Sequence, residues 1–232
     1  LASKILTENG SVTLNSIRGS IQLDNASIDC RGSGVLTVNS QQDCSLLGSL
    51  HPCVMEVGSG IADFTIGRDL TLTSTNIFTQ VAIASNKENL TGGSLQFTVE
   101  RNVSLLATDT SSLCLIGFST VSNAANVAGD ILFHHVGGDL ILEGANNIGP
   151  GNFGFAQIGH ISFLSLTEPV TLNGNISLLV DGSISLVGGS ASETSYAQIG
   201  HGGLYPFITT GQVTAIAGKN IVMQSNTGSA NI

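Results

Sequence analysis

Short runs of alternating apolar and polar residues recur along the whole chain. Each run begins at a glycine and places aliphatic or aromatic residues two positions apart. This spacing puts the apolar side chains on one face of an extended backbone, so each run predicts a short, half-buried β-strand. The runs occupy residues 10–14, 93–97, 129–133, 174–178 and 211–215.

A second strand-like element recurs eight or nine residues after the start of the first. It consists of Gly, Arg or Lys, then any residue, then two aliphatic residues two positions apart. Its starts are separated by 49, 33, 37, 44 and 37 residues, which indicates a repeated unit with loop insertions. The copies occupy residues 19–23, 68–72, 101–105, 138–142, 182–186 and 219–223.

A third element is the motif Ala-Gln-Ile-Gly-His, which occurs twice. Looser copies lie at residues 81–85 and 114–118. Three short strands per unit fit a coil that lays its strands on those of the previous coil. The two full copies are Ala156, Gln157, Ile158, Gly159 and His160, and Ala197, Gln198, Ile199, Gly200 and His201.

The pattern therefore predicts an all-β parallel β-helix, or β-solenoid, as a single domain over residues 1–232. The spacing leaves open whether one repeat is one large coil or two coils of about 18–20 residues. The long first interval predicts an irregular insertion that protrudes at about residues 39–58. The repeat pattern runs to both ends, so we expect the chain to be a segment of a longer repeat protein.

Composition agrees with strands and turns. Apolar residues make up 41% of the chain, which is enough to form a buried core. Charged residues make up only 10%, which is too few for the solvent-exposed faces of long helices. The net charge of −9 argues against a nucleic-acid partner, because such binding needs a basic surface. No run approaches the roughly 18 apolar residues of a transmembrane segment.

The strand at 138–142 and the segment at 196–203 carry a family resemblance. Together they resemble repeats of filamentous-haemagglutinin-type exoproteins of bacteria, over about residues 60–223. The resemblance implies a right-handed parallel β-helix, export across the envelope, and a role in adhesion, aggregation or surface structure. It also implies an extracellular or cell-surface location. The chain departs from the family at Ser85 and Phe118, which replace the motif histidine, and in its four cysteines.

The candidate metal ligands are His160 and His201, which occupy equivalent repeat positions and could face the same side of the helix. Ser85 and Phe118 fill this position in other repeats, and no Cys or carboxylate recurs at ligand spacing nearby. A turn histidine bonded to the backbone is therefore the favoured interpretation, and no metal site is predicted.

Among the cysteines, Cys44 and Cys53 are the candidate disulfide, closing a loop in an oxidising compartment. Cys114 aligns with alanines of the motif and is expected to be a buried free thiol.

Carboxylates would carry the chemistry of a carbohydrate-active β-helix enzyme. Such an enzyme needs acids that converge on one groove, and Asp63, Asp130, Glu143 and Asp181 are the candidates. Asp69 and Asp139 recur at one repeat position, so we interpret them as turn formers. No phosphate-binding loop, nucleophile elbow or His-Glu-x-x-His motif is present, and no cofactor is predicted.

The aromatic residues are mostly phenylalanine. Phe64, Phe97 and Phe133 fall at equivalent strand positions and predict a stacked column in the interior. Tyr196 and Tyr205, near a glycine-rich loop, are the candidates for contact with a glycan.

These observations favour a non-enzymatic bacterial surface or extracellular β-solenoid. It would act in adhesion or aggregation, or as a subunit of a filament or surface layer. Its expected partners are further repeats of a longer chain, other copies of itself end to end, or a glycan or protein on a cell surface. The alternatives are a carbohydrate-active enzyme and a carbohydrate-binding module.

Overall fold

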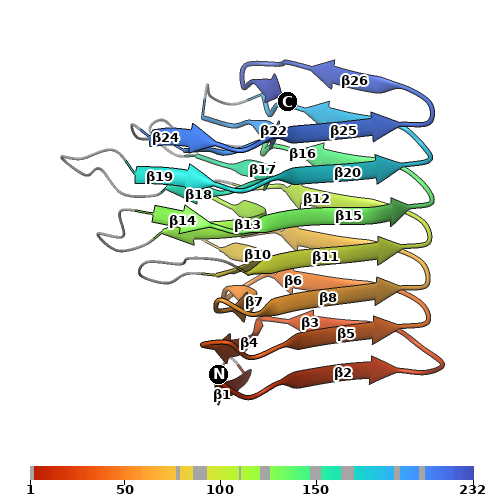
Figure 1. The fold of residues 1–232 in the computed structure, drawn as a ribbon. Helices are drawn as coiled ribbons and strands as arrows, with labels where there is room; N and C mark the ends of the chain where they lie inside the picture. The colour runs from red at the N-terminus through yellow and green to blue at the C-terminus, as the bar shows by residue number, and fades with distance from the viewer. Residues whose placement is uncertain are drawn as a thin grey trace.

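The computed structural model describes residues 3–76, 79–85, 93–109, 111–120, 126–146, 153–162, 170–190, 194–203 and 207–232. All regular elements within these ranges are β-strands, and neighbouring strands pair in parallel. The protein is therefore an all-β parallel β-helix, as the alternation of apolar residues predicts (Figure 1). Within these ranges no helix has the length and apolar character that crossing a membrane requires.

Three long parallel sheets form the body. Sheet A contains β1 (Ser3–Glu8), β4 (Ala26–Arg31), β7 (Cys53–Val57), β10 (Gln80–Ser85), β13 (Leu113–Thr120), β17 (Phe155–Ile158), β22 (Ala197–Ile199) and β27 (Ala230–Asn231), with β18 (Ile161–Ser162) and β23 (Gly202–Gly203) beside it.

Sheet B contains β2 (Val12–Ser16), β5 (Leu36–Ser40), β8 (Ile61–Ile66), β11 (Ser94–Val99), β15 (Asp130–Val136), β20 (Ile176–Val180) and β25 (Val213–Ala217). Sheet C contains β3 (Ile21–Asp24), β6 (Cys44–Gly48), β9 (Leu70–Ser74), β12 (Val103–Ala107), β16 (Leu140–Glu143), β21 (Ile184–Val187) and β26 (Ile221–Gln224). A small sheet D of β14 (Asn126–Ala128), β19 (Val170–Asn173) and β24 (Phe207–Thr210) flanks the later coils.

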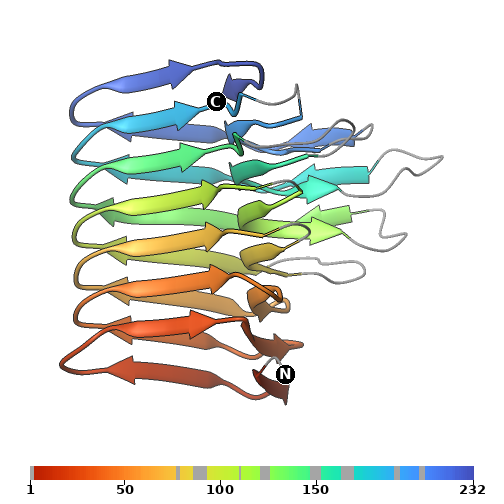
Figure 2. The same ribbon diagram turned by 180° about the vertical axis from the view of Figure 1, so that it is seen from behind.

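One coil contributes one strand to sheet A, then one to sheet B, then one to sheet C, and the next coil repeats this order (Figures 1 and 2). One repeat is thus one coil of three main strands, which answers the question that the spacing left open. The equivalent first residues of sheet C lie at positions 21, 44, 70, 103, 140, 184 and 221.

The insertion predicted at 39–58 is not observed. Strands β6 and β7 occupy this region and pair in register with the coils on either side. The long first interval in the sequence therefore holds two coils. The sequence pattern does not reveal the second of these coils, because Gln42 occupies the turn position at which the neighbouring coils carry Gly19 and Arg68.

The core is a set of columns that run along the stack. Because partner residues of adjacent strands are stacked in register, the inward residue of each coil lies on its counterpart in the next. Phe64, Phe97 and Phe133 form such a column, with ring centroids 4.9 and 4.4 Å apart and nearly parallel planes. All three rings are buried, so the predicted phenylalanine column is confirmed.

Replacing Phe97 by alanine removes the central ring of this column and leaves a cavity between two rings. We expect Phe97→Ala to lower the free energy of unfolding by about 3–5 kcal/mol, measured by urea-induced unfolding. Thr98→Ala, on the outer face of the same strand, is the control and should change it by less than about 1 kcal/mol. Equal losses in the two variants would show that the column does not carry the stability.

Candidate functional site

The motif histidines form a stacked pair. The rings of His160 and His201 have centroids 4.4 Å apart. In each ring Nδ1 accepts a hydrogen bond from the backbone of the preceding coil: Phe118 N–H donates to His160 over 3.3 Å, and His160 N–H donates to His201 over 3.2 Å. On the other side, Nε2 faces the carbonyl oxygens of Gly129 and Gly174, at 2.7 and 2.8 Å.

These contacts fix the charge state of the pair. A ring whose Nδ1 accepts a hydrogen bond and whose Nε2 donates one is the neutral tautomer. Burial, reinforced by the neighbouring His201, lowers the pKa of His160 to about 3, and burial also lowers the pKa of His201. Since both ring nitrogens are occupied by the backbone, neither ring offers a lone pair to a metal. His160 and His201 are therefore turn histidines bonded to the backbone, which is the interpretation that the sequence favours.

The glutamine of the motif serves the same turn. Gln157 is buried, and its Nε2 donates to the carbonyl oxygens of His160 and Gly200, at 3.2 and 3.0 Å. Gly159 has φ +151°, and a Cβ on it would lie 1.9 Å from the Gly200 oxygen, so only glycine fits. The motif therefore encodes a hydrogen-bonded turn at the end of the sheet A strand, and its side chains bond this turn to the neighbouring coils.

Tyr196 is part of the core. Its ring stacks on Phe155 with centroids 4.8 Å apart, and its hydroxyl donates to Gln157 Oε1 over 3.1 Å. Only 8% of the residue is exposed, so the expected glycan contact at Tyr196 is corrected. Tyr205 lies outside the described residues.

All four cysteines are buried free thiols. Cys44 is an inward residue of sheet C, stacked between Ile21 and Leu70, whereas Cys53 belongs to sheet A and donates to the Leu23 carbonyl. The predicted Cys44–Cys53 disulfide is therefore absent, because each thiol fills its own interior column. Burial raises the pKa of Cys44, as it does that of Cys114, to about 12. The expectation for Cys114 is confirmed.

The recurrent acids hold the turns before sheet C. One carboxylate oxygen of Asp43 accepts the backbone N–H of Asp69 over 3.3 Å, and Asp69 accepts that of Asn102 over 3.0 Å. Asn102 accepts the N–H of Asp139 over 2.9 Å, and Asp139 accepts that of Ser183 over 2.7 Å. Each side chain thus caps the backbone of the following coil, which confirms the interpretation as turn formers.

The acids considered for catalysis lie on different parts of the coil. Asp63 lies on the outer side of β8 in sheet B, and Glu143 ends β16 in sheet C. Asp130 caps the N–H of Asn175, and Asp181, in the turn after β20, lies 4.0 Å from His135. Among the described residues no group of three or more His, Cys, Asp or Glu side chains is arranged to hold a metal ion.

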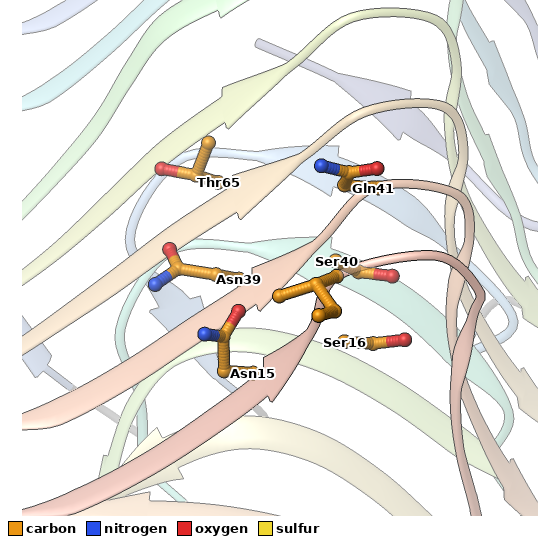
Figure 3. A pocket seen from close by; sticks show the side chains of 7 residues that line it. Asn15, Ser16, Asn39, Ser40, Gln41 and Thr65 are labelled. Carbon is orange, nitrogen blue, oxygen red and sulfur yellow. The ribbon is translucent and has the colours of Figure 1, made fainter.

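A shallow hollow of about 200 Å³ lies at the corner where sheet B turns toward sheet C. Figure 3 shows Asn15, Asn39 and Thr65 on three successive strands at its edge. Sequence reasoning missed these residues, although a signal exists: Val-Thr-Leu-Asn-Ser at 12–16 and Leu-Thr-Val-Asn-Ser at 36–40 are the same pattern in adjacent coils. The lining residues are Asn15, Ser16, Ile17, Asn39, Ser40, Gln41 and Thr65.

No protein-family model matches the chain, and no curated protein and no solved structure is significantly similar to it. The function must therefore be argued from the arrangement of the residues themselves.

The free, buried thiols give a direct test of the cysteine assignment. Because thiolate is the reactive form and each sulfur is shielded, we expect almost no reaction of the folded chain with a thiol reagent at pH 8. Four thiols should react after denaturation without reductant. Fewer than four under those conditions would show that a disulfide forms.

The neutral state of His160 predicts a pH-dependent stability. The unfolded chain takes up a proton below the ordinary histidine pKa of 6.5, whereas the folded chain holds the ring neutral down to about pH 3. The stability that His160 contributes is therefore complete above pH 6.5 and falls as the pH drops toward 3. The slope is up to about 1.4 kcal/mol per pH unit.

His160→Phe provides the comparison, since Phe118 occupies the same repeat position one coil earlier. Its unfolding free energy, measured by urea between pH 4 and 7, should change less with pH than that of the wild type. Identical pH dependence in both proteins would contradict the assignment.

Proposed function

We propose that this chain is a structural β-solenoid: a shaft segment of a bacterial surface or extracellular protein. In that role it acts in adhesion or aggregation, or forms part of a filament or surface layer. The observation that carries the proposal is the in-register stacking of the coils, whose strand ladders and core columns run along the described part of the chain. The arrangement of the polar repeat residues supports it.

The interior columns end on open faces. Met223 continues the column of Leu142 and Leu186, which are fully buried, yet Met223 is 55% exposed. Ile221 continues the column of Ile184 and is 47% exposed. At the other end Ile5 lies over the buried Ile28 and is 49% exposed. Both end faces therefore carry apolar side chains of the kind that a further coil covers elsewhere in the stack.

The strand edges at both ends are also open to pairing with further strands. Strands β1, β2 and β3 form the edge of the three sheets at one end, and β25, β26 and β27 at the other. Edge strands present unpaired N–H and C=O groups that template the addition of further strands. In the isolated chain, the partner that suits these edges is an end coil of another copy.

The polar residues of the repeat also support a structural role. The motif glutamine and the Asp and Asn residues before sheet C direct their hydrogen bonds to the next coil, and the motif histidine directs its own to the preceding coil. Hydrogen bonds between neighbouring coils hold the stack together and stiffen the rod. The resemblance to filamentous-haemagglutinin-type repeats supports the extracellular bacterial setting. The carbohydrate-active enzyme is the less favoured alternative, because the candidate acids are separated on the coil.

The exposed end faces predict concentration-dependent association of the isolated chain. We expect rods that lengthen end to end as concentration rises, observed by negative-stain electron microscopy and sedimentation velocity. Met223→Glu places a charge on an end face and should shift association to at least about tenfold higher concentration.

Leu179→Glu is the matched control, because Leu179 is 44% exposed but lies on the outer face of sheet B. It should leave association unchanged. Single rods of constant length at every concentration would contradict self-association of the isolated chain. Equal effects of the two variants would show that contact occurs through the sides of the rod.

A further inference from the structure

We propose that the hollow beside Asn15 and Asn39 is a binding subsite for a neutral polysaccharide that lies along the outer face of sheet B. The subsite is built from residues that the stacking of coils does not use. It goes beyond the structural function proposed above and does not depend on the end faces.

The amides at this site differ from the other asparagines of the coil. Asn25, Asn102 and Asn175 lie in turns, and each accepts backbone N–H groups of the next coil. Asn15 and Asn39 instead project from the outer face of sheet B, and their amides make no hydrogen bond to any other described residue. Two complete carboxamides, each with one acceptor oxygen and two N–H donors, are therefore available to a ligand.

The strand register sets these groups in line. Asn15 is the partner of Asn39, Asn39 of Thr65, and Thr65 of Thr98. Adjacent strands lie about 4.8 Å apart, so four polar side chains form a column parallel to the axis of the rod. A linear polymer lying along that column would meet a donor or acceptor at each coil, and a pyranose ring has dimensions similar to this step.

The chemistry of the lining selects the ligand. None of the residues around the hollow carries a formal charge, which disfavours acidic sugars, phosphates and metal ions as occupants. Carboxamides and hydroxyls pair well with neighbouring sugar hydroxyls, since both partners donate and accept. Ile17 is 64% exposed at the rim and offers an apolar contact for the C–H face of a sugar ring.

The size of the hollow limits the affinity. Its volume of about 200 Å³ is smaller than the roughly 300–1,000 Å³ of a pocket for a drug-sized molecule, so it holds about one sugar ring. One shallow subsite predicts a dissociation constant near 1 mM for a short oligosaccharide. A polymer that engages several coils, or several stacked rods, gains affinity through multivalency.

The test is an NMR titration of the ¹⁵N-labelled chain with cellohexaose, xylohexaose and mannohexaose, each to about 10 mM, with hexagalacturonate as the charged counterpart. We expect at least one neutral hexasaccharide to shift the side-chain NH₂ signals of Asn15 and Asn39. The backbone signals of the adjoining residues Ser16 and Gln41 should shift with them, and hexagalacturonate should leave them unchanged.

Asn15→Ala/Asn39→Ala should weaken this binding by about tenfold or more. Ser177→Ala/Thr214→Ala is the matched control, because these partner residues occupy the outer face of sheet B near the other end. It should bind as the wild type does. If the first double variant fails to fold, Asn39→Val replaces it and should also weaken binding, since valine suits a strand and has no side-chain hydrogen-bonding group.

The proposal is overturned if no neutral hexasaccharide shifts the Asn15 and Asn39 signals, if both double variants bind equally, or if hexagalacturonate binds as well as the neutral sugars. The titration is repeated with Met223→Glu, so that binding is measured on unassociated rods. Loss of end-to-end association and loss of sugar binding are then separate outcomes.

Discussion

Parallel, in-register hydrogen bonding between coils is the constraint on which the rest of this protein depends. Each strand of sheets A, B and C bonds to its counterpart in the next coil, so each residue lies about 4.8 Å from the equivalent residue. Identical apolar side chains tolerate this distance and stack, as Phe64, Phe97 and Phe133 do. Identical charges repel at that spacing, which agrees with the small share of charged residues in the chain.

The turns between strands continue this ladder only in part: Gly182 N–H donates to the Gly138 carbonyl of the preceding coil, but other backbone groups of the turns need side-chain partners. The protein satisfies them with neutral or capping side chains. His160 and His201 bridge a backbone N–H and a carbonyl, and Asp69 and Asn102 cap the following coil. Among the candidates for chemistry in the sequence, His160, His201 and Asp130 are used in this way. The polar groups that remain free, such as Asn15 and Asn39, lie on the outer face of a sheet.

The stack therefore has two kinds of surface, its ends and its sides. The ends of the stack present interior columns and unpaired strand edges, which suit contact with more coils. The sides present in-register columns of polar residues, which suit contact with a repeating polymer. The proposed association through the ends and the proposed binding through the sides concern different residues, so the two can be tested separately.

The sequence by itself determined the period-two strands, the solenoid, the phenylalanine column, the buried Cys114 thiol and the role of Asp69 and Asp139 in turns. Each of these features occupies a position that recurs from coil to coil, and such recurrence is visible without coordinates. Only the tertiary structure showed that residues 39–58 form an ordinary coil, that Cys44 and Cys53 fill separate columns, and that Tyr196 is buried. It also decided that the motif histidines are occupied by the backbone while Asn15 and Asn39 are free. The reason is physical: the pattern of residues predicts which side chains recur, but their hydrogen-bond partners belong to the neighbouring coil, whose register is set only when the sheets form.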